Sequence, residues 1–283
     1  MSYHHVDPYL SEALKKFEPG MTLADVLSYT SSTGHFDLYF EDSWTGYFIA
    51  KRFRERSRCD VLVLIHLDDH TDMMPTLLCR SGETLIDPTS GATFDPTSSS
   101  DWKAAIYSGA VNIGNFITPF YYSGCNVHVR HINNSKECDE LWQVSRDSCR
   151  YELIPDKQFA AVAKTSSDRL GNAGTYLAGS SPEDVLDGAP RAWTLIHIDL
   201  DYFINDFNGA SLGDSYTPDP MLRIRAHEKM DRFFHSLARL NPIVDRWLIA
   251  TSPGFCSAYH WEWLLSEIHG KIQKFEAAQA GSI

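Results

Sequence analysis

Two short apolar segments, each leading directly into acidic residues, constrain the fold of this 283-residue chain most. Residues 60–67 read Asp-Val-Leu-Val-Leu-Ile-His-Leu, and residues 193–200 read Trp-Thr-Leu-Ile-His-Ile-Asp-Leu. Successive apolar side chains of this kind are typical of strands that are buried on both faces of a parallel sheet. Ligands bind outside the carboxyl ends of such strands, so we expect a site where these two segments end.

Strand and helix patterns alternate along the rest of the chain. The predicted strands are residues 36–40, 60–67, 126–131, 193–200 and 246–250, and the predicted helices are residues 9–17, about 44–56, 101–113, 221–240 and 259–275. Ser181 and Pro182 mark a further helix start. Gly, Pro, Ser, Thr and Asp crowd residues 81–100 and predict a long loop, whereas residues 132–191 give no clear pattern. We therefore predict a single α/β domain over residues 1–283, with a mostly parallel central sheet and helices on both faces.

The charge and composition exclude several classes of function. The chain has 37 acidic and 25 basic residues, a net charge of −12, which argues against nucleic acid as a partner and is compatible with a metal ion or a cationic substrate. No apolar run approaches the roughly 20 residues of a membrane-spanning helix, and the first residues do not resemble a secretory signal, so we expect a soluble, cytoplasmic protein that does not engage a membrane. The six scattered cysteines lack a Cys-x-x-Cys pair, which argues against a zinc ribbon or a disulfide scaffold. The oligomeric state stays open.

The polar residues at the two strand ends follow the alternation of an extended chain. His66, Asp68, His70 and Asp72 are expected to converge on one side, with Asp69 pointing elsewhere. The second segment repeats this arrangement with His197, Asp199 and Asp201. Gathered carboxylates resist ionisation unless a cation lies among them, and oxygen ligands with some imidazole suit Mn²⁺ or Mg²⁺. The pattern therefore favours a metal site over solvated turns or a hydrogen-bonded polar cluster.

These motifs resemble those of a known enzyme family. Residues 68–72 (Asp-Asp-His-Thr-Asp) resemble the Asp-Ala-His-x-Asp motif of arginases and agmatinases, and residues 197–201 resemble their Asp-x-Asp motif. Residues 114–119, 198–203 and 252–255 are similar to a divergent ureohydrolase-like branch that includes the peptide arginases. The resemblance covers about residues 40–255. It implies a three-layer arginase- or deacetylase-like fold and hydrolysis of arginine side chains in a ribosomal precursor peptide to ornithine, with release of urea.

The resemblance also implies two Mn²⁺ ions and a set of ligands for them. Asp68 and Asp199 would bridge the ions, and the complete set of implied ligands is Asp68, His70, Asp72, Asp199 and Asp201. Ureohydrolases take one more histidine from a turn after an earlier strand, and Ser43 stands at that place here. Asp42, Glu41, His66 or a water molecule are the candidates to replace it. Mn²⁺, Mg²⁺ and Fe²⁺ all accept such oxygen-rich ligands.

Under this resemblance, water activated by the metal ions attacks the guanidinium carbon, and the departing amine must be protonated. The candidates for proton transfer are Asp201, His66, His197 and His260. The candidates for contact with the substrate are Asn115, Glu41 and Glu262, since a carboxylate fork matches a guanidinium.

Two other functions remain open. One is a small-molecule ureohydrolase or a deacetylase-like amide hydrolase, which would use one metal ion held by residues such as Asp68, His70 and Asp199. The other is a non-catalytic peptide-binding protein with a structural metal site, which the serine at position 43 favours.

Overall fold

The two apolar segments form neighbouring parallel strands in the computed structural model of the chain. These strands are β3 (Val61–Leu67) and β11 (Trp193–Asp199), and their register places His66 beside His197. The structure describes residues 7–55, 60–135, 140–165, 172–207 and 216–281. The expected pairing of the two segments at the centre of a sheet is therefore present.

Within the described residues the sheet has 12 strands in the order β1-β2-β12-β11-β3-β7-β10-β8-β9-β4-β5-β6. The remaining strands are β1 (Thr30–Ser32), β2 (Phe36–Tyr39), β4 (Cys79–Ser81), β5 (Thr84–Ile86), β6 (Thr93–Phe94), β7 (Asn126–Ile132), β8 (Trp142–Tyr151), β9 (Ile154–Thr165), β10 (Asn172–Gly179) and β12 (Val244–Ala250). The six strands from β2 to β10 pair in parallel, whereas β1 and the strands from β8 to β6 pair antiparallel. The sheet is thus mixed, and the prediction of a mostly parallel sheet holds only for its centre.

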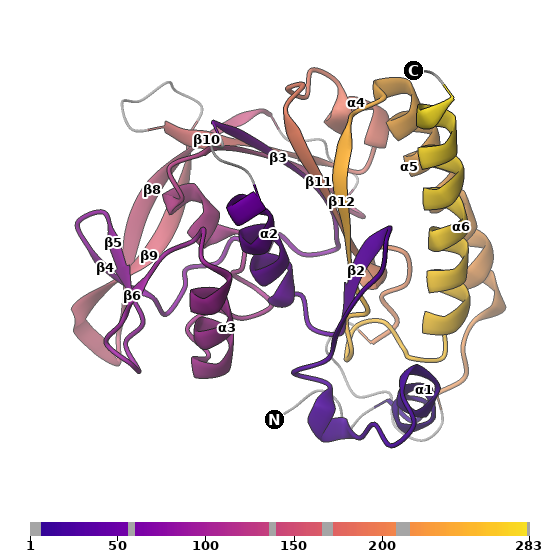
Figure 1. Cartoon of the computed structure of the whole chain (residues 1–283), viewed down its shortest axis with the longest axis horizontal. Helices are drawn as coiled ribbons and strands as arrows, with labels where there is room; N and C mark the ends of the chain where they lie inside the picture. The colour runs from indigo at the N-terminus through magenta and orange to yellow at the C-terminus, as the bar shows by residue number, and fades with distance from the viewer. Residues whose placement is uncertain (1–6, 56–59, 136–139, 166–171, 208–215, 282–283) are drawn as a thin grey trace.

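Helices cover both faces of the parallel centre, as the sequence predicts (Figure 1). α2 (Trp44–Glu55) and α3 (Ser99–Ser108) pack on one face. On the opposite face the helices are α1 (Leu10–Phe17), α4 (Pro182–Leu186), α5 (Pro220–Leu240) and α6 (Trp261–Ala280). Short 3₁₀ helices occur at Leu23–Asp25, Thr118–Tyr122 and Leu200–Tyr202. The described residues therefore form one α/β domain with helices on both sides of its sheet.

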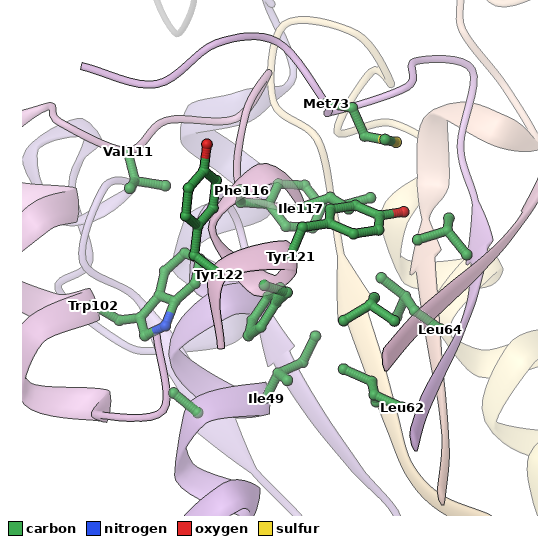
Figure 2. Packing of buried hydrophobic residues seen from close by; sticks show 14 of the residues in the cluster. Ile49, Leu62, Leu64, Met73, Trp102, Val111, Phe116, Ile117, Tyr121 and Tyr122 are labelled. Atoms are coloured by element: carbon green, nitrogen blue, oxygen red, sulfur yellow. The ribbon is translucent and has the colours of Figure 1, made fainter. Parts of the chain in front are cut away.

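The core on the α2 and α3 face is rich in aromatic side chains (Figure 2). Trp102 stacks on Phe120 at a centroid separation of 4.9 Å, in the same core cluster as Leu62 and Leu64 of β3. A Cβ atom on Gly46 would lie 2.0 Å from the Trp102 ring, so only glycine lets α3 approach α2 this closely. The packed helices α2 and α3 therefore cover the sheet face on which the polar ends of β3 and β11 lie.

Three sequence predictions need correction. Residues 81–100 are not a plain loop, because β4 to β6 form short antiparallel pairs around a turn in which Gly82 has a φ of 62°. The helix predicted at 101–113 runs from Ser99 to Ser108, since the Ser98 side chain caps its start and Gly109 ends it in a left-handed conformation. Residues 132–191 contain the long antiparallel strands β8 and β9, of which β9 is exposed over its first five residues and so lacks apolar alternation.

Among the described residues, no helix combines the length and the apolar character that a membrane crossing requires.

Candidate metal centre

A row of three histidines crosses the sheet face just below the strand ends. The register pairs His66 of β3 with His197 of β11 on one side and with His131 of β7 on the other. All three rings are buried. Two residues before the histidines, on the same face of the sheet, β3 and β11 carry apolar side chains, with Leu64 beside Leu195. The row therefore separates the apolar core from the polar end of the sheet.

Five buried carboxylates lie at this polar end, beyond the histidine row. They are Asp42, Asp68, Asp72, Asp199 and Asp201, and each is at most 5% exposed. Here they are called the acidic cluster. Asp42 reaches it from the turn between β2 and α2, where Thr45 N donates a hydrogen bond to the Asp42 carbonyl (2.9 Å). Three separate segments of the chain thus deliver carboxylates to one place.

Backbone geometry holds the acidic side chains in position. Asp72 has a φ of 49°, a left-handed conformation that is unfavourable for a residue with a Cβ atom, and Ile117 N holds its carbonyl with a hydrogen bond of 3.1 Å. The Asp199 carboxylate accepts a hydrogen bond from Asp201 N (3.0 Å), which orders the turn after β11. His70 N donates to Asp68 Oδ1 (2.6 Å) and fixes the equivalent turn after β3.

The carboxylates of the acidic cluster lack enough donors for their oxygens. Among the described residues, three of these buried oxygens have no hydrogen-bond partner, namely Asp42 Oδ1, Asp68 Oδ2 and Asp72 Oδ2. Asp201 Oδ2 receives no backbone donor and lies 2.9 Å from His70 Nδ1. Among the described residues, the side chains that form ion pairs with these five carboxylates are all histidines. Buried charge without partners is costly, so this arrangement requires protons or a cation.

The pKa values show the same imbalance in the absence of a cation. Burial, together with repulsion between neighbouring carboxylates, raises the pKa of Asp42, Asp68, Asp72 and Asp199 well above the usual range. Burial also raises the pKa of Asp201. Hydrogen bonds to Asp201 (2.9 Å) and Asp68 raise the pKa of His70 to about 10. The cluster binds protons tightly, as metal ligands do when no metal competes for them.

The buried histidines behave in the opposite way. Burial lowers the pKa of His197 to about 3 and that of His131 to about 4, and it lowers the pKa of His66 well below the usual value. These three rings are therefore neutral. A neutral imidazole has one nitrogen with a free lone pair, and that lone pair is what binds a metal ion.

The donor set fits a divalent cation. Potential ligand atoms lie within 4.8 Å of one another in three groups, which are Asp42, Asp68 and Asp199; Asp68, His70 and Asp201; and His66, Asp68 and His197. Asp68 belongs to all three groups, and carboxylate oxygen outnumbers nitrogen. This buried His/Asp cluster could hold a metal ion, and its oxygen-rich composition suits Mn²⁺ or Mg²⁺ rather than a thiolate-binding metal.

The structure brings together every residue expected as a metal ligand. Of the candidates to replace the histidine at Ser43, Asp42 and His66 contact the acidic cluster, and Glu41 is half-buried next to Asp42. Asp69 points away, as expected, and accepts hydrogen bonds from Asn134 (2.9 Å) and Asn205 (3.0 Å).

Three other expected site residues lie apart from the cluster. Asn115 Oδ1 accepts from Asn112 N (2.8 Å), so its side chain closes a turn behind Asp72. Glu262 forms an exposed ion pair with Lys16, and His260 lies 3.3 Å from Asp206. The residues that line the groove holding His260 and Glu262, about 970 Å³ in volume between α1 and the start of α6, include none of the five carboxylates.

A second buried acidic pair lies beside that groove, formed by Asp7 and Asp206. Asp7 accepts hydrogen bonds from Ala258 N (2.6 Å), Tyr9 N (3.0 Å) and the Ser257 hydroxyl (3.2 Å). Asp206 accepts from Ser257 N (2.9 Å) and from the Tyr216 hydroxyl. Here they are called the braced pair, because hydrogen-bond donors of the protein satisfy both carboxylates.

Sequence reasoning did not connect His131 with the site. His131 Nε2 lies 3.0 Å from the Asp68 carbonyl, and its Nδ1 lies 2.8 Å from the Tyr176 hydroxyl. The strand that carries it was predicted, and a histidine near the end of a third apolar strand was the available signal. The alignment of His131 with His66 depends on the register between β3 and β7, which cannot be predicted from the sequence pattern of either strand.

No protein-family model matches this chain, and none of the curated proteins compared with it matches either. The similarity to ureohydrolases therefore remains a prediction from the two strand-end motifs.

Proposed function

We propose that this chain is a binuclear-metal hydrolase that converts arginine side chains of a peptide to ornithine and releases urea. The single observation that carries the proposal is the acidic cluster, in which five buried carboxylates leave three oxygens without a hydrogen-bond partner among the described residues. Two divalent cations, Mn²⁺ by our expectation, would supply the missing positive charge. They would be held by Asp68, His70, Asp72, Asp199 and Asp201, with Asp42 close by.

The charge of the cluster supports a cationic substrate. Five ionised carboxylates and two divalent cations leave one negative charge in a buried place, and electrostatic interactions are strong there because water is excluded. A guanidinium group carries one positive charge and planar N–H donors that match carboxylate oxygens. Free arginine also carries such a group, so the peptide specificity rests on the resemblance of residues 114–119, 198–203 and 252–255.

The acidic cluster is accessible on the side of His70. This side chain is 39% exposed, whereas the five carboxylates are buried. The half-buried ring of Phe255 lies against it at a centroid separation of 4.8 Å. We therefore expect an arginine side chain to approach the cluster on the side of His70.

Bound cations would supply an activated water molecule and stabilise negative charge that develops during hydrolysis. The chain itself orients the substrate and provides the proton for the departing amine. Glu41, half-buried beside Asp42, is the substrate-contact candidate next to the cluster, and its carboxylate would hold the guanidinium. Asp201 is the candidate that would pass a proton to the departing amine, because its carboxylate contacts His70 at the exposed side.

The direct test is urea release from an arginine-containing peptide and from free arginine, each with MnCl₂. We expect urea from the peptide and ornithine in the product, which mass spectrometry detects as the loss of the amidine unit. Urea from free arginine alone would assign a small-molecule ureohydrolase instead. No urea from either substrate, with metal ions bound, would contradict the proposal and favour a peptide-binding protein.

One observation favours a second candidate, a hydrolase of amide bonds with a single metal ion. Asp68, His70 and Asp201 alone form a compact Asp-His-Asp group, with His70 Nδ1 2.9 Å from Asp201 and 3.4 Å from Asp68. A deacetylase-like enzyme would need only such a group. One Mn²⁺ ion per chain, together with deacetylation of an acetyl-lysine peptide, would support this candidate over the first.

A further inference from the structure

The contact between His66 and His197 determines which of the two rings can bind a metal ion. Their Nδ1 atoms are 2.9 Å apart, within hydrogen-bond distance, and both rings are fully buried. A hydrogen bond between two neutral imidazoles needs one Nδ1–H donor and one bare Nδ1 acceptor. The ring that donates then has a bare Nε2, and the ring that accepts has an Nε2–H. The pair therefore offers a single Nε2 lone pair.

The surroundings of the two Nε2 atoms decide which ring offers it. His66 Nε2 lies 3.2 Å from the carbonyl oxygen of His70, an acceptor that requires a hydrogen on this nitrogen. His197 Nε2 is buried and has no hydrogen-bond partner. His66 thus carries its hydrogen on Nε2, and His197 carries its hydrogen on Nδ1. The bare lone pair belongs to His197.

The lone pair of His197 faces a carboxylate oxygen that also lacks a partner. His197 Nε2 and Asp42 Oδ1 are 3.5 Å apart, and neither atom has a hydrogen bond. Two such acceptors repel each other unless a proton or a cation lies between them. Nitrogen and oxygen ligands that are each about 2.0–2.2 Å from one cation are about 3–3.5 Å apart. The observed separation is the one expected for two ligands of the same ion.

We propose that His197 Nε2 and Asp42 Oδ1 are ligands of one metal ion and together replace the histidine that Ser43 does not provide. This inference rests on the proposed metal centre and completes its ligand set. Asp68 has a potential ligand atom within 4.8 Å of Asp42 in one group and of His197 in another, so Asp68 is the further ligand of that ion. His66 is then a positioning residue, which holds the His197 ring through Nδ1 and the His70 carbonyl through Nε2. His197 thereby has a role different from proton transfer.

Histidine tautomers in the wild-type protein test the inference without a variant. Two-dimensional ¹⁵N–¹H correlation spectra of the metal-free protein are expected to show His66 protonated at Nε2 and His197 protonated at Nδ1. Addition of MgCl₂ or ZnCl₂, which are diamagnetic, is expected to shift His197 Nε2 and to leave His66 Nε2 protonated. The reverse tautomers, or a shift at His66 Nε2 alone, would overturn the inference in favour of His66 as the ligand.

Mn²⁺ stoichiometry in matched variants gives an independent readout. His197→Asn keeps a donor near the Nδ1 position but removes Nε2, and we expect it to bind one Mn²⁺ ion where the wild type binds two. His197→Gln keeps an oxygen near the Nε2 position and is expected to bind two ions. His66→Asn keeps an acceptor near its Nδ1 position and is also expected to bind two ions, with affinities reduced by up to about 10–100-fold.

The outcomes separate this inference from the proposed function. Two Mn²⁺ ions in both wild type and folded His197→Asn would overturn the inference and leave the binuclear centre intact. No bound Mn²⁺ in the wild type would overturn both. If His197→Asn does not fold, as judged by circular dichroism, the tautomer spectra of the wild type decide.

Discussion

The acidic cluster and the braced pair are both made of buried aspartates, but the protein surrounds them in different ways. Asp7 and Asp206 accept hydrogen bonds from backbone N–H groups and hydroxyls. In the acidic cluster, four carboxylate oxygens have no such donor. Asp7 also has a raised pKa because of burial, so burial alone does not separate the two groups.

The two groups differ in the source of the donors or the positive charge that satisfies their carboxylates. The braced pair receives donors from the chain itself and ties the segment at Asp7 to residues 257 and 258, which is a structural role. The acidic cluster collects carboxylates from three segments and receives mainly histidine contacts, which leaves room for an external cation. Buried oxygen without a hydrogen-bond donor among the described residues, more than acidity, distinguishes the candidate metal centre from the braced pair.

Substitution of Asp199 is expected to have the largest effect. Asp199→Ala removes a carboxylate shared by both proposed metal positions, so bound Mn²⁺ and urea release should both fall by more than about 100-fold. Metal analysis after dialysis and a urea assay on the arginine-containing peptide measure these losses. Asp206→Ala in the braced pair is the matched control and should keep both Mn²⁺ ions. Retained urea release in Asp199→Ala would contradict the assignment.

Metal ions are expected to stabilise the fold, and more so at higher pH. The raised pKa values of the cluster carboxyls and of His70 (about 10) mean that the metal-free folded state binds protons more tightly than the unfolded state does. Their contribution to stability is present below the unfolded pKa values and is lost as pH rises through the folded ones. The free energy of unfolding without metal should therefore fall from about pH 7.5 toward the pKa of His70 at about 10. Above about pH 7.5 the buried histidines, whose pKa values are lowered in the folded state, are neutral in both states.

Mn²⁺ replaces those protons, so the stabilisation that it gives should increase over the same range. It amounts to about 2.7 kcal/mol per site where the Mn²⁺ concentration is 100 times the dissociation constant. Denaturant unfolding with MnCl₂ or with EDTA measures the difference at each pH. A stabilisation that is independent of pH would place the metal outside the acidic cluster.

Substitution in the braced pair is expected to affect stability alone. Asp7→Ala leaves the donors at Tyr9, Ser257 and Ala258 without their acceptor, which should lower the free energy of unfolding by about 1–3 kcal/mol. The number of bound Mn²⁺ ions should stay at two, as equilibrium dialysis can determine. A loss of metal in this variant, at a temperature where it is folded, would show that the two acidic groups are not independent.

Asp69 is expected to give the smallest effect, although it lies inside the first acidic motif. Its side chain points away from the cluster toward Asn134 and Asn205, and its backbone N–H bond to Asp201 survives substitution. Asp69→Ala should therefore change the free energy of unfolding by about 1 kcal/mol or less and leave Mn²⁺ stoichiometry unchanged. A change from two bound Mn²⁺ ions to one would show that Asp69 takes part in metal binding. It would contradict the prediction that side-chain alternation after β3 directs Asp69 away from the metal ligands.

Sequence patterns predicted the centre of this molecule well because its signals are local. The apolar runs of β3 and β11 and the alternation at positions 66–72 follow from neighbouring residues alone, and both strands lie where they were expected. The helices at α2, α5 and α6 were predicted to within a few residues for the same reason. β8 and β9 were missed because they lie outside the parallel centre of the sheet and part of each strand is exposed, which removes the apolar pattern.

The parts of the site that were not predicted depend on contacts between distant segments. Asp42 was one of three candidates for the place of the missing histidine, and only the packing of the turn before α2 buries it beside Asp68 and Asp199. His131 joins the histidine row through the register of β7. Glu262 was a candidate for contact with the substrate and His260 a candidate for proton transfer on side-chain chemistry alone. Both lie at the start of α6, beside α1 at the separate groove.

An anomalous difference map from crystals grown with MnCl₂, recorded near the manganese absorption edge, tests the central claim most directly. The account predicts two peaks among Asp42, Asp68, Asp72, Asp199 and Asp201, separated by about 3.5–4 Å. A map without a peak at this place, in crystals that contain Mn²⁺ at millimolar concentration, would contradict it and would leave the five carboxylates as a protonated structural cluster.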